Sequence, residues 1–268
     1  MKIALAQIAS RADTDYNFDL VERFSRSATQ QGADLIVFPE YAMVDMPELD
    51  AAFITQAEPL DGPFVSRVRD LARTLRVTIV LGVLEKLAED ERASNTLVAV
   101  DAAGEVVATY RKLHLYDAFG FEESLFIKPG ATVGAATFDV AGARVGMLTC
   151  YDLRFPEAAR QHADADVDVL VYPSCWLPGP RKEDHWKTLA RARAIENTMF
   201  VAPVSQAAPL GTGGSFLVDP MGLVCGELDG AAGMTVVEVD PQRIRDVRAT
   251  NPSLAHRRFT VVPAGVVA

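Results

Sequence analysis

Cysteine is scarce in this sequence, which holds three, Cys150, Cys175 and Cys225, in a chain of 268 residues. Their wide spacing lacks the paired pattern that holds a structural zinc ion, and an odd number cannot be fully paired by disulfides within one chain. We therefore expect no cysteine-based metal site and a reduced, cytoplasmic setting.

Long apolar runs are also absent. No stretch approaches the roughly 18 consecutive apolar residues of a membrane-spanning helix, so we expect no membrane partner. The first strand-like segment runs directly into Arg11, Asp13 and Asp15, and the N-terminus therefore lacks the apolar stretch of a signal peptide. No linker rich in Ser, Pro or Gly interrupts the chain, which favours a single domain over residues 1–268.

Basic residues are fewer than acidic ones, 26 against 36, and the formal net charge at pH 7 is −10. This balance argues against nucleic acid or an anionic membrane as the main partner, because both repel a negative surface. Apolar residues make up 49% of the chain, which is enough for an extensive core. The composition is typical of a soluble globular protein.

Helical and extended patterns alternate along the chain, and antiparallel hairpins interrupt the alternation in both halves. Apolar strands that are buried on both sides and separated by amphipathic helices favour a layered α/β sandwich. Helices are expected at 18–28, 63–76, from 156 onward and at 185–198. Strands are expected at 2–8, 34–38, 77–84, 94–100, 105–110, 137–140, 144–148, 167–172, 199–204, 214–218, 223–226 and 235–239.

Three of the expected strands end in a side chain with a use in catalysis. Pro39 ends one strand and places Glu40 beyond it, while Lys112 and Cys150 follow two later strands. A thiol needs a base to become a nucleophile, and a tetrahedral intermediate needs a cation or N–H donors for its oxyanion. If these strand ends are neighbours, the three side chains form a site for nucleophilic hydrolysis.

Cys150 is the candidate nucleophile because it stands at a strand-to-helix junction, shortly before Pro156 opens a helix. Backbone N–H groups converge at such a junction and the helix dipole favours an anion, so we expect a lowered thiol pKa. Taken singly, each residue has a simpler interpretation: Cys150 as a small buried hydrophobe, Glu40 as a turn residue and Lys112 as a solvated charge. Their joint occurrence after apolar strands favours the catalytic interpretation.

Three ordered motifs resemble those of the nitrilase superfamily of carbon–nitrogen hydrolases: FPE at 38–40, YRKLHL at 110–115 and CYDLRFPE at 150–157. The resemblance covers nearly the whole chain. It implies a four-layer αββα sandwich of two mixed sheets flanked by helices. It also implies a triad in which Glu40 is the general base and acid, Lys112 stabilises the oxyanion and Cys150 is the nucleophile.

The resemblance also implies supporting residues around the triad. Glu123, followed by Ser124, is similar to a family carboxylate that positions substrate and the catalytic lysine, although Glu122 stays open as an alternative. The backbone N–H of Tyr151, directly after the nucleophile, is expected to donate to the oxyanion together with Lys112.

Candidate substrate-binding residues come from two segments. Cys175 and Trp176 end another strand in a stretch similar to the family's pocket wall, and Tyr41 directly follows Glu40. Cys175 is not expected to be the nucleophile, because the Tyr-Asp-x-Arg pattern that follows Cys150 is absent there. Cys225 is expected in the core.

On this resemblance the reaction is hydrolysis of a small linear amide through a cysteine thioester, with release of ammonia and a carboxylate and no metal or organic cofactor. The residues after Cys150 resemble the amidase branch, similar to ω-amidase and deaminated glutathione amidase, more than true nitrilases. An N-carbamoyl or ureido amidohydrolase, a nitrilase, and an inactive binding or scaffolding member remain as alternatives.

The resemblance further implies a homodimer or a higher homo-oligomer. The helix at 185–198 is similar to one that the family uses for pairing, and the C-terminal segment at about 240–268 is expected at the interface. The sequence leaves the substrate open among ω-amides, deaminated glutathione, simple amides and carbamoyl compounds.

Overall fold

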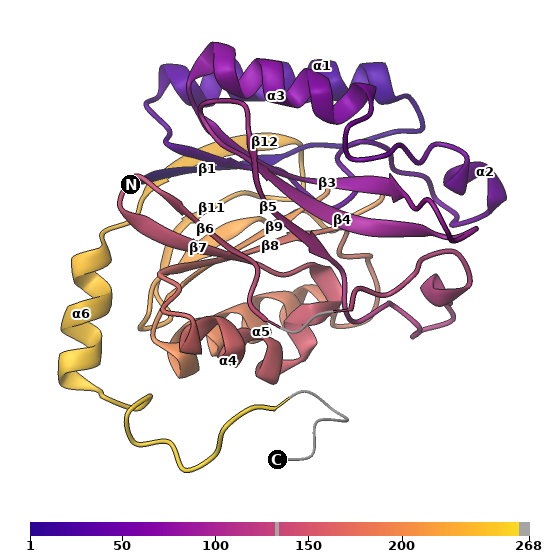
Figure 1. Cartoon of the computed structure of the whole chain (residues 1–268). Coiled ribbons are helices and arrows are strands. Elements are labelled where there is room, and N and C mark those ends of the chain that lie inside the picture. Colours follow the sequence, from indigo (N-terminus) through magenta and orange to yellow (C-terminus); the bar gives the residue numbers. More distant parts are fainter. Residues whose placement is uncertain (132–133, 263–268) are drawn as a thin grey trace.

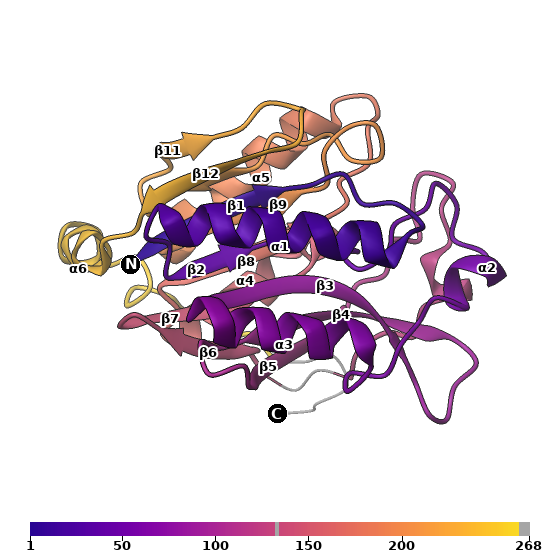
Figure 2. The same ribbon diagram turned by 90° about the horizontal axis from the view of Figure 1, so that it is seen from above.

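The computed structural model describes residues 1–131 and 134–262 and consists of two stacked β-sheets covered by helices on both outer faces (Figure 1). Helices α1 (Thr14–Gln30) and α3 (Pro63–Leu75) lie side by side over the first sheet, as the view from above shows (Figure 2). Helices α4 (Pro156–Asp164) and α5 (Lys182–Asn197) cover the second sheet. The expected four-layer αββα sandwich is confirmed.

The first sheet has the strand order β12-β1-β2-β3-β4-β5. Its centre is parallel, because β1, β2 and β3 are joined through helices, and it continues antiparallel through the β3–β4–β5 meander. The bounds are β1 Lys2–Gln7, β2 Leu35–Val37, β3 Thr78–Lys86, β4 Ala93–Val100, β5 Val106–Arg111 and β12 Gly233–Glu238.

The second sheet repeats this design with the order β11-β10-β9-β8-β7-β6. Strands β7, β8 and β9 are parallel, and hairpins extend the sheet antiparallel at both edges. The bounds are β6 Thr137–Val140, β7 Ala143–Met147, β8 Val169–Ser174, β9 Phe200–Ser205, β10 Phe216–Val218 and β11 Val224–Glu227.

The core follows from the apolar runs that predicted the strands. β1, β2, β3, β8 and β9 are buried almost throughout, since each sheet has a helix layer on one face and the other sheet on the opposite face. Every expected strand and helix is present to within a few residues at its ends. The short helices α2 (Ala51–Ile54) and α6 (Pro241–Thr250) and the 3₁₀ helices η1 (Glu123–Leu125) and η2 (Cys150–Arg154) are additional.

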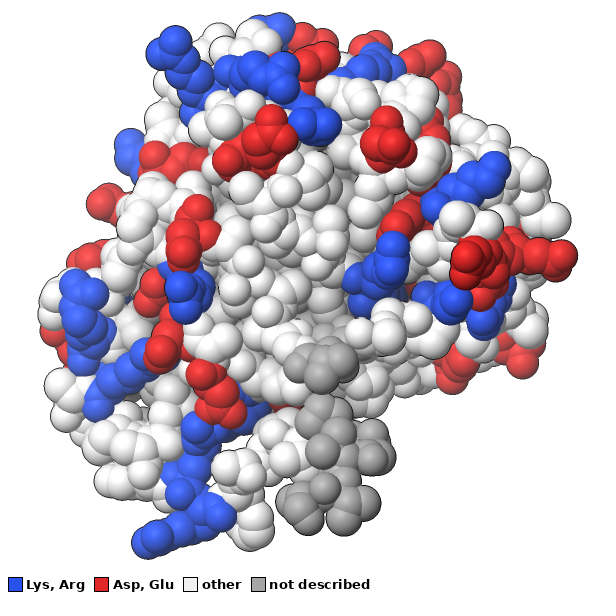
Figure 3. Space-filling view, in the orientation of Figure 1, with Lys and Arg blue, Asp and Glu red and all other residues white. Residues whose placement is uncertain are grey.

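The surface carries acidic and basic side chains interspersed, with a broad uncharged area at the centre of the face in Figure 3. Within the described ranges, no helix combines the length and the apolar character needed to cross a membrane. Cys225 corrects one expectation: it lies exposed on the edge strand β11, most of whose residues are exposed, rather than in the core.

Candidate active site

The three strand ends meet at one end of the sandwich. Glu40 follows β2 of the first sheet, Lys112 follows β5 of the same sheet, and Cys150 follows β7 of the second sheet. All three line one cavity with about 670 Å³ of unfilled space, part of it open to solvent. The site therefore forms where the carboxyl ends of strands from both sheets face each other.

Glu40 is buried, with 1% of its surface exposed, and its carboxylate is held by three donors. Oε1 accepts hydrogen bonds from Lys112 Nζ at 2.9 Å and from Asn95 Nδ2 at 2.6 Å. Oε2 accepts a bond from the backbone N–H of Cys175 at 2.7 Å. These bonds fix the carboxylate in one orientation toward the cavity.

A glycine on the neighbouring strand makes room for this segment. A Cβ at Gly82 of β3 would lie 2.7 Å from Glu40 Cα and 2.6 Å from the Tyr41 backbone nitrogen, closer than real contacts allow. The backbone of Tyr41 adopts the left-handed region at φ 58° and turns the chain away from the sheet. Glu40 is thus placed by a close backbone approach as well as by its hydrogen bonds.

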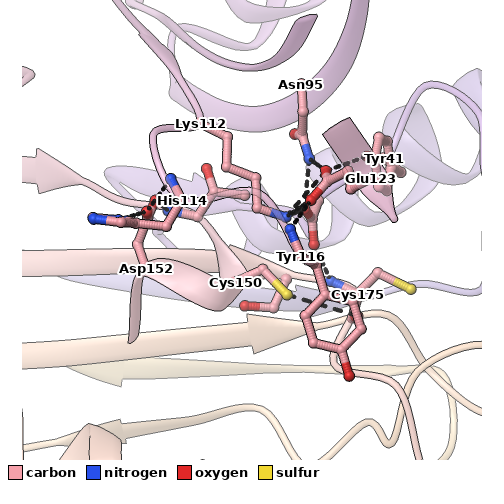
Figure 4. Close-up of polar contacts among 12 residues, drawn as sticks. Tyr41, Asn95, Lys112, His114, Tyr116, Glu123, Cys150, Asp152 and Cys175 are labelled. Atoms are coloured by element: carbon pink, nitrogen blue, oxygen red, sulfur yellow. Dashed lines mark hydrogen bonds and ion pairs between the residues drawn. The ribbon is translucent and has the colours of Figure 1, made fainter. Parts of the chain in front are cut away.

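Lys112 is buried between two carboxylates (Figure 4). Its ammonium lies 2.9 Å from Glu40 Oε1 and 2.9 Å from Glu123 Oε2. Burial alone would lower the pKa of this ammonium, but the charges of Glu123 and Glu40 outweigh burial and raise the pKa well above its ordinary value. Lys112 is therefore a permanent cation in the cavity wall.

Glu123, and not Glu122, is the second carboxylate of the cavity. It begins the 3₁₀ helix η1, is 2% exposed, and accepts bonds from Tyr41 Oη at 2.9 Å and from the Tyr116 backbone N–H at 2.6 Å, besides those from Lys112. Of the two glutamates that the sequence left open, Glu123 lines the cavity, whereas Glu122 is exposed.

Asn95 is a site residue that the sequence analysis missed. Its side-chain amide donates to Glu40 at 2.6 Å and to Glu123 at 3.1 Å and therefore bridges the two carboxylates. Figure 4 shows Asn95 beside Glu123 and the Lys112 ammonium. The signal in the sequence is Ser94-Asn95-Thr96, three polar residues in a strand that is buried throughout. Buried polar residues need partners, which points to a polar site.

Cys150 occupies a strained junction, with φ at 45°, as the first residue of η2. Its thiol donates to the backbone carbonyl of Cys175 at 3.7 Å. The peptide backbone of Cys175 therefore contacts both Cys150 and Glu40. A non-glycine residue in the left-handed region costs of order 1–3 kcal/mol and is typical of functional sites.

The expected lowering of the Cys150 pKa is wrong. Burial and the charge of Glu40 raise the pKa of the thiol well above its ordinary value, although Lys112 acts in the opposite direction. The helix that follows Cys150 is a 3₁₀ helix of five residues, and α4 begins only at Pro156, so the dipole is short. A raised pKa favours the protonated thiol, so that a base is needed to form the thiolate.

Asp152 joins the lysine segment to the cysteine segment. It is fully buried and accepts bonds from Tyr110 Oη at 2.7 Å and from the Thr149 backbone N–H at 2.9 Å. Its second oxygen accepts from the backbone N–H of His114 at 3.1 Å and contacts the His114 ring nitrogen Nδ1 at 2.6 Å. One carboxylate thus fixes the chain on both sides of the cavity.

The three candidate substrate-binding residues all line the cavity, as does Tyr151. The Tyr41 hydroxyl is directed to Glu123, and the Trp176 indole N–H donates to the backbone carbonyl of Lys182 at 2.8 Å. The Cys175 thiol donates to Asp45 Oδ2 at 3.5 Å.

Further lining residues were missed by the sequence analysis: Asp45, Met46, Pro47, Leu49, Tyr116, Phe121, Leu177, Lys182 and Leu210. Apart from Lys182, which begins α5, they lie in loops, whose course depends on contacts between the two sheets, and they carry no local motif. Asp45 is buried, and burial raises the pKa of its carboxyl well above the usual range. Across residues 1–131 and 134–262, no three His, Cys, Asp or Glu side chains are grouped as they would be to hold a metal ion.

Residues 2–249 match the family model for carbon–nitrogen hydrolases, and the chain belongs to that family. The resemblance to the nitrilase superfamily is confirmed. The protein is an enzyme that hydrolyses carbon–nitrogen bonds of amides.

Particular relatives place the chain among the amidases of this family. It is 36% identical over 260 residues to the deaminated glutathione amidase of Escherichia coli O157:H7, covering 97% of this chain and 98% of the relative. The NitFhit protein of C. elegans superposes with a TM-score of 0.89 at 29% identity; the match covers 96% of this chain and 65% of that longer one.

A third relative is an amidase whose structure shows a covalent adduct at its active-site cysteine. A mutant of the amidase from Nesterenkonia sp. AN1, solved after Michael addition of acrylamide at its active-site cysteine, has a TM-score of 0.77 at 28% identity, with 93% of this chain and 97% of that chain covered.

Proposed function

We propose that Cys150, Glu40 and Lys112 carry out amide hydrolysis in this protein, with Cys150 as the nucleophile. The observation that carries the proposal is that one buried cavity is lined by a thiol, a carboxylate and an ammonium, with the latter two 2.9 Å apart. The assignment also accords with the active-site cysteine described for the Nesterenkonia amidase.

In the first half of the reaction, Glu40 takes the proton of the Cys150 thiol, whose pKa is raised by burial and by the charge of Glu40. The sulfur attacks the amide carbonyl carbon, and the carbon–oxygen π electrons move to the oxygen. The Lys112 ammonium and the Tyr151 backbone N–H donate to this oxyanion. The intermediate then collapses, the carbon–nitrogen bond breaks, and ammonia leaves with the proton from Glu40.

In the second half, Glu40 takes a proton from water, and the hydroxide adds to the thioester carbonyl. The same two donors stabilise the second oxyanion. Collapse breaks the carbon–sulfur bond, the thiolate of Cys150 recovers the proton from Glu40, and a carboxylic acid is released, which loses its own proton to solvent. The protons balance within the triad, so the scheme needs no cofactor.

Glu123 is proposed to act through Lys112 rather than on the substrate. Its carboxylate contacts the ammonium at 2.9 and 3.2 Å and is itself held by Tyr41, Asn95 and the backbone of Tyr116. The ammonium is thereby kept at one point of the cavity wall, where an oxyanion donor must be fixed before the reaction.

The substrate is proposed to be a small linear amide, with ω-amides and deaminated glutathione as the first candidates, because the bacterial relative at 36% identity is named a deaminated glutathione amidase. The test is an ammonia-release screen of α-ketoglutaramate, deaminated glutathione, simple amides, nitriles and N-carbamoyl amino acids. Cys150→Ala serves as the control for contaminating activity. Turnover of nitriles or carbamoyl compounds without turnover of amides would overturn the amidase assignment.

The protein is further proposed to be a cytoplasmic homodimer that pairs through α5 and the adjacent β10–β11 turn. Ile195, Met221, Leu223 and Val224 are large apolar side chains left exposed there, and a Cβ on Gly222 would lie 2.7 Å from Ile195, which shows that α5 and the turn are in contact. A contiguous exposed apolar patch is typical of an interface between copies.

Light scattering tests the dimer. Leu223→Asp is expected to give a monomer, and Leu125→Asp, at an exposed leucine in η1, is the matched control. A monomeric wild-type protein would contradict the proposal. The expected interface at about 240–268 includes α6, which extends beyond the end of the sandwich in Figure 1, while residues 263–268 lie outside the described part of the chain.

A further inference from the structure

A second cation lines the cavity, at a place that the triad does not use. Lys182, the first residue of α5, is 5% exposed, and its ammonium donates a hydrogen bond to the Tyr116 hydroxyl at 2.7 Å. Both residues belong to the cavity lining together with Trp176 and Tyr151.

The environment of Lys182 differs from that of Lys112 in one respect. Lys112 has two carboxylate partners at 2.9 Å, whereas within residues 1–131 and 134–262 no carboxylate lies within 4.0 Å of the Lys182 ammonium. Three aromatic rings surround it instead, those of Tyr116, Phe119 and Trp176, at 4.7, 5.0 and 5.2 Å from Nζ to the ring centres. Burial lowers the pKa of this lysine. A sequestered ammonium without a counter-ion is costly, and an anionic ligand would offset that cost.

Arg154 adds a second positive charge to the same aromatic cluster. Its guanidinium lies 5.0 Å from the Trp176 ring centre and 5.8 Å from that of Phe119. Its Nε is buried without a hydrogen-bond partner, and its Nη2 contacts only the ring nitrogen of His185, at 3.5 Å, among the hydrogen bonds of the described residues. Lys182 and Arg154 are thus two cations near this end of the cavity, and neither forms an ion pair with a carboxylate among the described residues.

Tyr116 lies between the Lys182 end of the cavity and the triad and has hydrogen-bond partners at both. Its backbone N–H donates to Glu123, beside Lys112, while its hydroxyl accepts from Lys182. Figure 4 shows the Tyr116 ring extending away from Glu123 and the Lys112 ammonium, with the hydroxyl at the far end. Tyr116 therefore spans the cavity wall between the triad and Lys182, along the course that a linear substrate would need in order to reach both.

We propose that the Lys182 ammonium and the Tyr116 hydroxyl form a carboxylate subsite, which selects amides that carry an anionic group at the end remote from the scissile bond. The subsite rests on the proposed amide hydrolysis at Cys150. It fits ω-monoamides of dicarboxylic acids, because their two ends match the two ends of the cavity: an amide for the triad, a carboxylate for Lys182.

The experiment compares kcat/KM for glutaramate with that for pentanamide, a neutral amide of the same chain length, in wild type and Lys182→Met. Methionine keeps the length of the side chain and removes the charge. Because a hydrogen bond to a charged group is lost for one substrate only, the ratio of the two kcat/KM values is expected to fall roughly 10- to 100-fold, mostly through KM. Lys182→Arg keeps the charge and should retain most of the ratio.

Lys187→Met is the matched control. Lys187 lies on the same helix, but its ammonium pairs with the exposed Glu227 instead of facing the cavity. The ratio of the two kcat/KM values in Lys187→Met should equal that of wild type. An unchanged ratio in Lys182→Met, or an equal fall in Lys187→Met, would overturn the subsite.

A second readout does not depend on turnover. Glutarate is expected to protect Cys150 from iodoacetamide, and the half-protecting concentration should rise roughly 10-fold or more in Lys182→Met but not in Lys187→Met. If the wild-type protein releases no ammonia from any amide, the proposed function fails. The protection of Cys150 by glutarate still tests the carboxylate subsite in that case. Equal protection of wild type and Lys182→Met would refute it.

Discussion

Asp152→Asn tests whether one buried carboxylate holds the lysine and cysteine segments together. Asp152 Oδ2 accepts from Tyr110 and Thr149, and Oδ1 accepts from the backbone of His114 and contacts its ring. The asparagine amide replaces one oxygen by a donor. In either orientation one backbone N–H, that of Thr149 or that of His114, faces the amide N–H and loses its bond, and the charge that strengthened the other bonds is gone.

The magnitude follows from these contacts. Hydrogen bonds to a charged group contribute about 1.5–3 kcal/mol each, so the lost bond costs about 1.5–3 kcal/mol of stability, before the weakening of the other bonds is added. For a chain of this size, that corresponds to a Tm lower by roughly 3–12 °C or more, since 1 kcal/mol shifts Tm by about 2–4 °C. The catalytic rate should fall as well, because Thr149 and His114 lie next to Cys150 and close to Lys112 in the chain.

The assay is thermal unfolding followed by circular dichroism at a fixed scan rate, with kcat measured at a temperature where each variant is folded. Asp139→Asn is the matched control, because Asp139 forms an exposed ion pair with Arg144 that contributes little. An Asp152→Asn protein with the wild-type Tm and kcat would refute the role of Asp152.

Three further predictions follow from the same geometry. Lys112→Met should lower kcat by about 10²- to 10³-fold, the cost of one oxyanion donor, with a smaller change in KM. Steady-state assays of ammonia release measure both constants, and a wild-type kcat in Lys112→Met would contradict the role of Lys112 as an oxyanion donor. Burial lowers the pKa of His162, so the unfolded chain binds more protons than the folded one below about pH 6.5, and the stability that is full above that pH should decrease as the pH falls. In Tm scans from pH 7.5 to 5.5, the decrease in Tm should be smaller in His162→Gln than in wild type. An equal dependence of Tm on pH in the two proteins would contradict this. Cys175→Ser should retain activity, because the contacts of residue 175 with Glu40 and Cys150 are made by the backbone; a loss as complete as that of Cys150→Ala would contradict it.

The strand ends could be predicted from the sequence because each is a local signal. Apolar runs stop at Pro39, before Lys112 and at Cys150. Strands β2 and β5 run in the same direction in one sheet, which brings their carboxyl ends to the same edge, whereas the position of Cys150 opposite them depends on the packing of the second sheet. The structure adds that β12 returns from the second half of the chain to pair with β1, a pairing that no local pattern indicates.

Other parts of the site were not predictable because they depend on contacts between distant segments. Asn95 lies in an ordinary strand and becomes a site residue only because Glu40 and Glu123 lie on either side of it. Lys182 begins a helix whose charged pattern is typical of a solvated face, yet its ammonium is turned into the cavity. The pKa of Cys150 was predicted in the wrong direction because burial and the charge of Glu40 are properties of the assembled site.

The central claim is that Cys150, and not Cys175 in the same cavity, forms the covalent intermediate. The most direct test is peptide mapping by mass spectrometry of the wild-type enzyme after acid quenching during turnover of an amide substrate. The account predicts an acyl group on the peptide that contains Cys150 and none on the peptide that contains Cys175. An acyl group on Cys175, or undiminished turnover in Cys150→Ala, would contradict it.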